Sequence, residues 1–131
     1  MILDRYLKFL QEAHKTNHVQ ITIGKMTANV EIAKTPDQIY TGLSNRSELN
    51  DQGMLFLMPN QEVHSFCMRG MNQPLDFIWI NNGRVVGATP NISPTFSENI
   101  TSPTQVSQVL ELPAGFVDKY GIKKGDKVIL N

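Results

Sequence analysis

Two opposite charges stand where apolar segments of this sequence end and begin. Arg69 closes the segment 63–69, and Asp76 is the second residue of the segment 75–81. Residues 70–74, which include a glycine and a proline, connect the two segments. If both segments are neighbouring strands, the guanidinium and the carboxylate come within reach of each other across the hairpin. Such a pair is either an ion pair that fixes the loop or a charged clamp for a ligand.

A second acidic residue also needs a partner. Glu31 interrupts an alternating segment with Val30 and Ile32 on either side. A carboxylate that faces away from solvent requires a cation, and Arg46 and Arg69 are the candidates. The alternative is that Glu31 lies on the solvated edge of a hairpin.

Together these charges favour a small polar-ligand or carbohydrate binding module with a charged pocket. The predicted ligand-binding residues are Glu31, Arg46, Arg69 and Asp76. Residues 90–105 are rich in Pro, Ser, Thr and Asn and predict a long surface loop that covers the pocket. Two alternatives remain open. One is a small hydrolase or lyase with Asp76 or Glu31 as general base, and the other is a protein-interaction subunit.

The remaining reactive side chains form no recognisable constellation. Cys67 and His64 are three residues apart, and side chains at this spacing in a strand point to opposite faces. This spacing argues against a nucleophilic pair of Cys67 and His64. His14 and His18 lack further ligands in the sequence, and one cysteine cannot build a thiolate metal site. We predict neither a metal nor a cofactor, and no catalytic residue is assigned.

Composition limits the size of the fold and the class of partner. The chain has 131 residues, which is enough for one domain with a single core. Its 12 Lys and Arg balance its 12 Asp and Glu, so the net charge gives no attraction to nucleic acid. Charges interrupt residues 1–10, which fit neither a signal peptide nor a membrane span. Apolar spacing predicts an amphipathic helix over residues 1–17, which either covers the domain or contacts a protein or membrane surface.

Hydrophobic patterns and turn signals predict a β-rich single domain over residues 18–131 with a few short helices, rather than a parallel α/β sheet. A hairpin over residues 19–32 turns at Gly24-Lys25, and Asn82-Gly83 marks a second hairpin. Residues 35–38 form a capping box for a short helix. Further strands are predicted over 54–58, 63–69, 75–81, 85–86, 109–112 and 127–130, and a helix over 114–120. The predicted core residues are Val30, Ile32, Leu55, Phe56, Leu57, Phe66, Phe77, Trp79, Val85, Leu110, Val128 and Ile129.

Several motifs of this sequence resemble one family. They are HSFCMRGMNQPLDFIWINNGRVV from His64 to Val86, EIA at 31–33, TGL at 41–43, GMLF at 53–56, VLEL at 109–112 and GIKKGDKV at 121–128. From Val19 to the C-terminus the chain resembles domain of unknown function 192 (DUF192). The resemblance implies a compact barrel-like or sandwich-like β fold but no activity, because the family is biochemically uncharacterised. Many relatives carry a large aromatic residue where Cys67 stands, so the resemblance also implies that Cys67 is a small buried hydrophobe. Many relatives carry an N-terminal export or anchor segment, so we expect an exported protein if a leader was removed and a cytoplasmic one if Met1 is the natural start.

Overall fold

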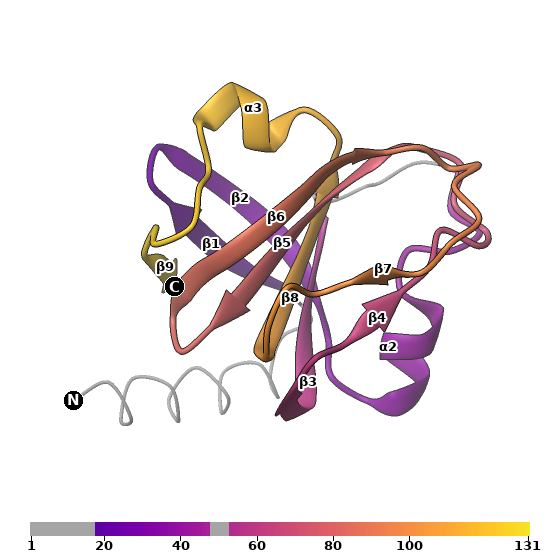
Figure 1. Ribbon diagram of the computed structural model, residues 1–131, viewed down its shortest axis with the longest axis horizontal. Helices are drawn as coiled ribbons and strands as arrows, with labels where there is room; N and C mark the ends of the chain where they lie inside the picture. The colour runs from indigo at the N-terminus through magenta and orange to yellow at the C-terminus, as the bar shows by residue number, and fades with distance from the viewer. Residues whose placement is uncertain (1–17, 48–52) are drawn as a thin grey trace.

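The computed structural model describes residues 18–47 and 53–131. The helix predicted over residues 1–17 lies outside the described residues. The fold is mostly β, as predicted, and its main sheet of seven strands curls into a half-barrel (Figure 1). The elements are β1 (His18–Ile23), β2 (Met26–Ala33), α2 (Pro36–Thr41), β3 (Met54–Glu62), β4 (Ser65–Phe66), β5 (Leu75–Asn81), β6 (Arg84–Ile92), β7 (Ile100–Thr101), β8 (Val106–Pro113), α3 (Phe116–Tyr120) and β9 (Val128–Leu130).

The main sheet has the strand order β6-β5-β8-β3-β2-β1-β9. Its neighbouring strands are antiparallel except β2 and β3, which are parallel. Parallel neighbours need a crossover connection, and the connection between β2 and β3 contains α2. The short strands β4 and β7 pair with each other in a separate two-stranded sheet.

Local sequence signals explain the first elements. The β1–β2 hairpin turns at Gly24, whose φ of +58° is readily adopted by glycine. The capping box before α2 is confirmed: Thr35 Oγ1 accepts the Gln38 N–H at 3.2 Å, and Gln38 Oε1 accepts the Thr35 N–H at 3.1 Å. Pro36 occupies the first helical turn, where its missing N–H has no cost. These signals place α2 directly after the end of β2.

The edge strands of the main sheet are β6 and β9, and the curl of the sheet brings them together at one end. The Val85 N–H of β6 donates to the Asp126 carbonyl at 2.9 Å. The Val128 N–H at the start of β9 donates to the Gly83 carbonyl, also at 2.9 Å. The segment that precedes β9 therefore occupies the edge of β6 and closes this end of the half-barrel.

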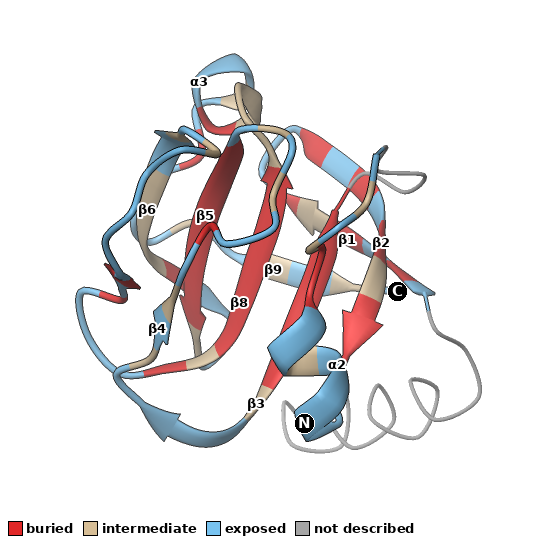
Figure 2. Cartoon of the chain, turned by 90° about the vertical axis from the view of Figure 1, so that its right-hand side faces the viewer, coloured by how far each residue is buried: buried red, intermediate tan, exposed pale blue. Residues whose placement is uncertain are grey.

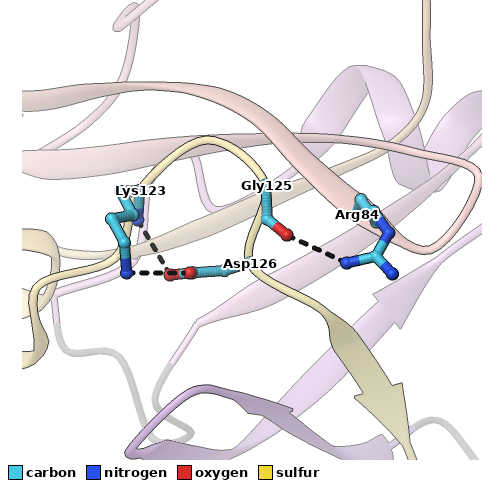
Figure 3. Close-up of polar contacts among 4 residues, drawn as sticks. All are labelled: Arg84, Lys123, Gly125 and Asp126. Carbon is cyan, nitrogen blue, oxygen red and sulfur yellow. Dashed lines mark hydrogen bonds and ion pairs between the residues drawn. The ribbon is translucent and has the colours of Figure 1, made fainter.

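Side chains reinforce the closing turn (Figure 3). Arg84 Nη1 donates to the Gly125 carbonyl at 3.1 Å. The Lys123 backbone N–H and ammonium donate to the two Asp126 carboxylate oxygens at 2.9 and 3.1 Å. The backbone hydrogen bond, followed by the side-chain bond, lowers the pKa of the Asp126 carboxyl below its ordinary value of 3.8. The turn is thus held at both ends by charged side chains.

Alternate residues of the central strands supply two separate apolar clusters, so the sheet is buried on both faces (Figure 2). One cluster combines residues from every strand of the main sheet with α3 and fills the inside of the curl. The other, which we call the aromatic face, carries Phe56, Phe77 and Trp79, with Phe66 of β4 packed on them. The rings of Phe77 and Trp79 stack with centroids 5.7 Å apart, and Phe56 and Phe66 meet edge to face at 5.2 Å. In Figure 2, β3 and β8 are seen on this face between α2 and β4.

Three predicted element boundaries were wrong. Pro59 was expected to end β3, but the strand continues to Glu62 through an irregular register, where a proline without an N–H is tolerated. The predicted strand 63–69 contains only the two residues of β4. The predicted loop 90–105 contains the end of β6 and all of β7. The β6 extension includes Pro90, which fits because β6 is an edge strand of the sheet.

Two predictions about burial also need correction. Cys67 is exposed rather than buried, because β4 ends one residue earlier and the alternation does not continue through it. Ile129 of the edge strand β9 is 39% exposed and does not belong to the core. Most of the other predicted core residues are buried, while Phe66 and Val128 are half-buried at the margins of the two clusters. Within the described residues, no helix combines the length and apolar character needed to span a membrane.

Candidate functional site

The predicted pair between Arg69 and Asp76 does not form. Asp76 is fully buried, and its Oδ1 accepts the Asn91 N–H at 2.8 Å. Its Oδ2 accepts the Gly115 and Val117 N–H groups at 3.1 and 2.9 Å. These donors belong to β6 and to the first turn of α3, so Asp76 connects three segments that are distant in the sequence. Its carboxylate is already satisfied by backbone groups, as expected for a structural residue.

Glu31 does form an ion pair, and its partner is Arg46. Arg46 Nη1 lies 2.7 Å from Glu31 Oε1, and both side chains are partly exposed. The pair lines a shallow hollow of about 420 Å³ beside α2, together with Asp37 and Gln38. Because both charges are paired, this hollow offers a ligand no unsatisfied charged group from the pair.

Arg69 lies at a different and larger cavity of about 780 Å³. Its side chain is exposed and makes no hydrogen bond or ion pair with any described residue. The cavity extends between α2 and β4, and Phe56 and Met58 of β3, Phe66 of β4 and Asn99 before β7 contribute to its lining. Within the loop 90–105, which was predicted to cover the pocket, Asn99 is the residue that lines this cavity. Thr41 and Gly42 at the end of α2 line both cavities, so the two hollows are neighbours.

Two turns that meet at the wall of the larger cavity position Arg69. The Asn45 N–H donates to the Gly70 carbonyl at 2.7 Å, and Ser44 Oγ donates to the Arg69 carbonyl at 2.9 Å. Gly70 has a φ of +78°, and a Cβ at this position would lie 3.1 Å from the Ser44 Cβ. Only glycine allows this conformation and this close approach without strain. The backbone of Arg69 is therefore fixed, while its exposed guanidinium lies at the rim of the cavity.

Glu111 of β8 lies deep in the same cavity. It pairs with Met54 of β3 and Phe77 of β5, so its side chain enters the aromatic face of the sheet. It is only 5% exposed, and it makes no hydrogen bond or ion pair with any described residue. Every fully enclosed polar side-chain atom of the described residues has a partner, so the unpartnered Glu111 oxygens face the cavity. Burial raises the pKa of the Glu111 carboxyl from 4.5 to about 8.

Comparison with known proteins places the fold in a family. The model of DUF192, described as an uncharacterised family, matches residues 19–130. The chain belongs to DUF192. No curated protein matches this DUF192 chain.

Two solved structures are similar to this DUF192 protein. One is a protein from Sinorhizobium meliloti 1021 that is described as a "putative transcription regulator". Its sequence is 28% identical, and the match has a TM-score of 0.81 and covers 86% of this chain and 93% of that chain. The other is a protein of unknown function from Novosphingobium aromaticivorans DSM 12444. It has 31% identity and a TM-score of 0.78 over 86% of this chain and 84% of that chain. Both matches cover most of this chain, so the similarity extends over most of the fold.

The cavity of this DUF192 chain combines hydrogen-bond donors with apolar rings. At neutral pH Glu111 is protonated and can donate one hydrogen bond, while Arg69 offers five N–H donors and a positive charge. The rings of Phe56 and Phe66 line the same cavity and give it an apolar wall. In residues 18–47 and 53–131, no three His, Cys, Asp or Glu side chains are grouped to hold a metal ion.

Sequence reasoning missed Glu111 in this DUF192 chain. Residues 109–112 read VLEL, and the segment was interpreted only as a strand and a family motif. The available signal was a carboxylate within a short, otherwise apolar run. A strand of this kind is commonly buried on both faces, so its one acidic side chain has to be buried as well.

Proposed function

We propose that this protein binds a small polar organic molecule in the cavity between α2 and β4. The observation that carries the proposal is Glu111, a buried carboxyl group without a hydrogen-bond partner among the described residues. Leaving such a group unsatisfied costs about 1 to 3 kcal/mol. A ligand that hydrogen-bonds to Glu111 would recover this free energy.

The size and lining of the cavity support the same proposal. A volume of about 780 Å³ lies within the range of small-molecule sites in proteins. The lining combines apolar rings with a few polar side chains, among them Arg69, Asn45 and Asn99. Of the four residues predicted to bind a ligand, Arg69 lines this cavity and the Glu31–Arg46 pair lies in the neighbouring hollow. Asp76 is not included, because its carboxylate already accepts three backbone hydrogen bonds.

A thermal-shift screen with sugars, nucleosides, amino acids and organic acids tests the proposal. We expect at least one compound to raise the melting temperature of the parent protein and to lose this effect in Glu111→Leu, which can neither donate nor accept a hydrogen bond. Glu62→Leu is the matched control, because Glu62 is exposed and does not line the cavity. If every hit stabilises parent, control and Glu111→Leu equally, the cavity is not the binding site and the proposal fails.

A second candidate is a small hydrolase or lyase, and one observation favours it. The raised pKa of about 8 places Glu111 near neutrality, where a general acid or base is most effective. Glu111 then replaces Asp76 and Glu31, the bases expected from the sequence, since both are occupied by structural partners. Turnover of chromogenic esters, glycosides or amides that is lost in Glu111→Gln but kept in Glu62→Gln would support this function.

Binding of nucleic acid is not proposed. The Sinorhizobium meliloti relative is described as a "putative transcription regulator". In this chain 12 basic residues balance 12 acidic ones, which leaves no overall attraction to phosphate. We also propose no function as an interaction subunit, since the segment expected to contact a protein or membrane surface, residues 1–17, lies outside the described residues.

A further inference from the structure

The cavity between α2 and β4 is lined by two groups that can carry charge and have no partner among the described residues. They are the Arg69 guanidinium at the rim and the Glu111 carboxyl deep inside. The other titratable residues in the lining are Tyr40 of α2 and Cys67 beyond β4, and no Asp, Lys or His of the described residues joins them. The charge of this cavity therefore depends on Arg69 and on the protonation of Glu111.

The charge of Arg69 and the protonation state of Glu111 determine which ligand charge the cavity favours. Desolvation keeps Glu111 neutral at pH 7, so Arg69 alone gives the cavity a positive charge. A cationic ligand would meet the unpaired guanidinium and would have to remove the proton from Glu111. An anionic ligand would pair with Arg69 and leave the proton of Glu111 in place. Both groups then stabilise the bound anion, so the electrostatics favour an anion.

The chemistry of the two groups narrows the class of anion further. A guanidinium matches a planar carboxylate through two parallel N–H···O bonds. A protonated carboxyl group donates one hydrogen bond and therefore needs an acceptor oxygen. Phe56 and Phe66 line the same cavity and suit an apolar body.

We infer that the ligand is a small organic carboxylate with an apolar body, bound through its carboxylate to Arg69 and through an acceptor oxygen to Glu111. This inference rests on the proposed function and goes beyond it by naming the ligand class. It also implies that binding depends on pH. Once Glu111 ionises, it loses its donor and repels the anion, so the affinity falls as the pH rises above about 8. The same cavity is also lined by Arg69, Tyr40 and Cys67. The pH dependence of binding that remains in the Glu111→Gln variant comes from these and other groups, so the variant separates it from the contribution of Glu111.

Three probes with the same phenol body and different charge test the ligand class: 4-hydroxyphenylacetate, its amide and tyramine. Calorimetric titration at about pH 6.5 is expected to give the carboxylate an affinity at least about tenfold above those of the amide and the amine. Arg69→Gln is expected to remove this preference, while Lys124→Gln, the matched change at an exposed residue outside the cavity, keeps it. At about pH 9 the parent is expected to bind the carboxylate about tenfold more weakly, and Glu111→Gln is expected to show a much smaller change.

The outcomes distinguish this inference from the proposed function. Equal or tighter binding of the amide or the amine overturns the carboxylate class, while a Glu111-dependent hit of another chemistry leaves the proposed function intact. Failure of all three probes to bind at about 10 mM also overturns the inference, since this concentration detects even weak complexes. Only a screen without any Glu111-dependent hit overturns the proposed function as well. An affinity that falls equally with pH in the parent and in Glu111→Gln contradicts the role of the Glu111 proton.

Discussion

Glu111 of β8 and Phe77 of β5 are directly paired on neighbouring antiparallel strands. Their side chains share the aromatic face of the sheet, so a carboxyl group lies beside a phenyl ring instead of a polar partner. Carboxyl groups with a pKa raised in this way cluster at functional sites of proteins. The pairing explains why the Glu111 carboxyl holds its proton, and it gives the cavity its main chemical property.

This pairing predicts how the stability of Glu111→Gln depends on pH. The folded pKa of about 8 is above the ordinary 4.5, so between these values the folded protein binds more protons than the unfolded chain. The contribution of Glu111 to stability is therefore complete below about pH 4.5 and is lost as the pH rises to about 8. Relative to parent, Glu111→Gln should gain stability over this range, by at most about 5 kcal/mol.

Urea unfolding at about pH 5, 7 and 9 measures this difference. Glu62→Gln is again the control, since it removes an exposed carboxylate outside the cavity. If the free energy of unfolding changes with pH in the same way in the parent and in Glu111→Gln, burial does not raise the pKa of the Glu111 carboxyl.

Replacement of Asp76 by Asn should lower stability without removing the binding site. An amide presents one acceptor oxygen and turns an NH₂ toward backbone N–H groups, so at least one of the Asn91, Gly115 and Val117 donors loses its partner. We expect a loss of about 2 to 4 kcal/mol by chemical denaturation, because hydrogen bonds to a buried charge are strong. Asp37→Asn, in the exposed first turn of α2, is the comparison. If Asp76→Asn unfolds like the parent but loses the response to ligand, Asp76 belongs to the site after all.

Gly53 should tolerate no side chain. Its φ is +143°, and a Cβ there would lie 2.1 Å from the Glu111 carbonyl oxygen. Gly53→Ala must therefore displace the start of β3 from β8, at a cost of at least about 2 kcal/mol. Gly24→Ala is the control, because Gly24 also has a positive φ but no atom within 4 Å of the added Cβ. Its expected cost is about 1 to 2 kcal/mol, from the backbone strain alone. Equal stability of the two variants would contradict the close approach of β3 and β8.

Cys67 offers a test of ligand access. Because the thiol is exposed at the lining of the cavity, Cys67→Ala should change stability by less than about 0.5 kcal/mol. A thiol reagent should modify Cys67 in the folded protein, and a ligand bound in the cavity should slow this reaction. Modification at the same rate with saturating ligand would place the ligand elsewhere. A large loss of stability in Cys67→Ala would mean that the cysteine is packed in the core.

The fold was predictable from the sequence because its signals are local. Alternation, the Asn82-Gly83 turn and the Thr35 capping box each depend on a few adjacent residues, and all three are confirmed. The Glu31–Arg46 pair is one of the two pairings considered for Glu31, which was expected to need a cation if it faced away from solvent. The boundaries of β3 and β6 were missed, because their irregular registers allow Pro59 and Pro90 within the strands.

The site was harder to predict because its contacts are not local. Adjacent residues of a strand point to opposite faces, and Leu75 and Phe77 occupy the aromatic face. Asp76 therefore points away from that face and from the cavity that Arg69 lines, toward backbone donors near Asn91 and Gly115. These donors are far from Asp76 in the sequence, so no motif shows them.

The most direct test of the account is the NMR titration of the Glu111 side-chain carboxyl carbon, assigned by its loss in Glu111→Gln. In the free protein we expect an apparent pKa of about 8. With a saturating carboxylate ligand we expect this pKa to rise further, because the bound anion accepts a hydrogen bond from the neutral carboxyl and opposes its ionisation. An ordinary pKa near 4.5 in the free protein, or the same titration curve with and without saturating ligand, would contradict a ligand site at Glu111.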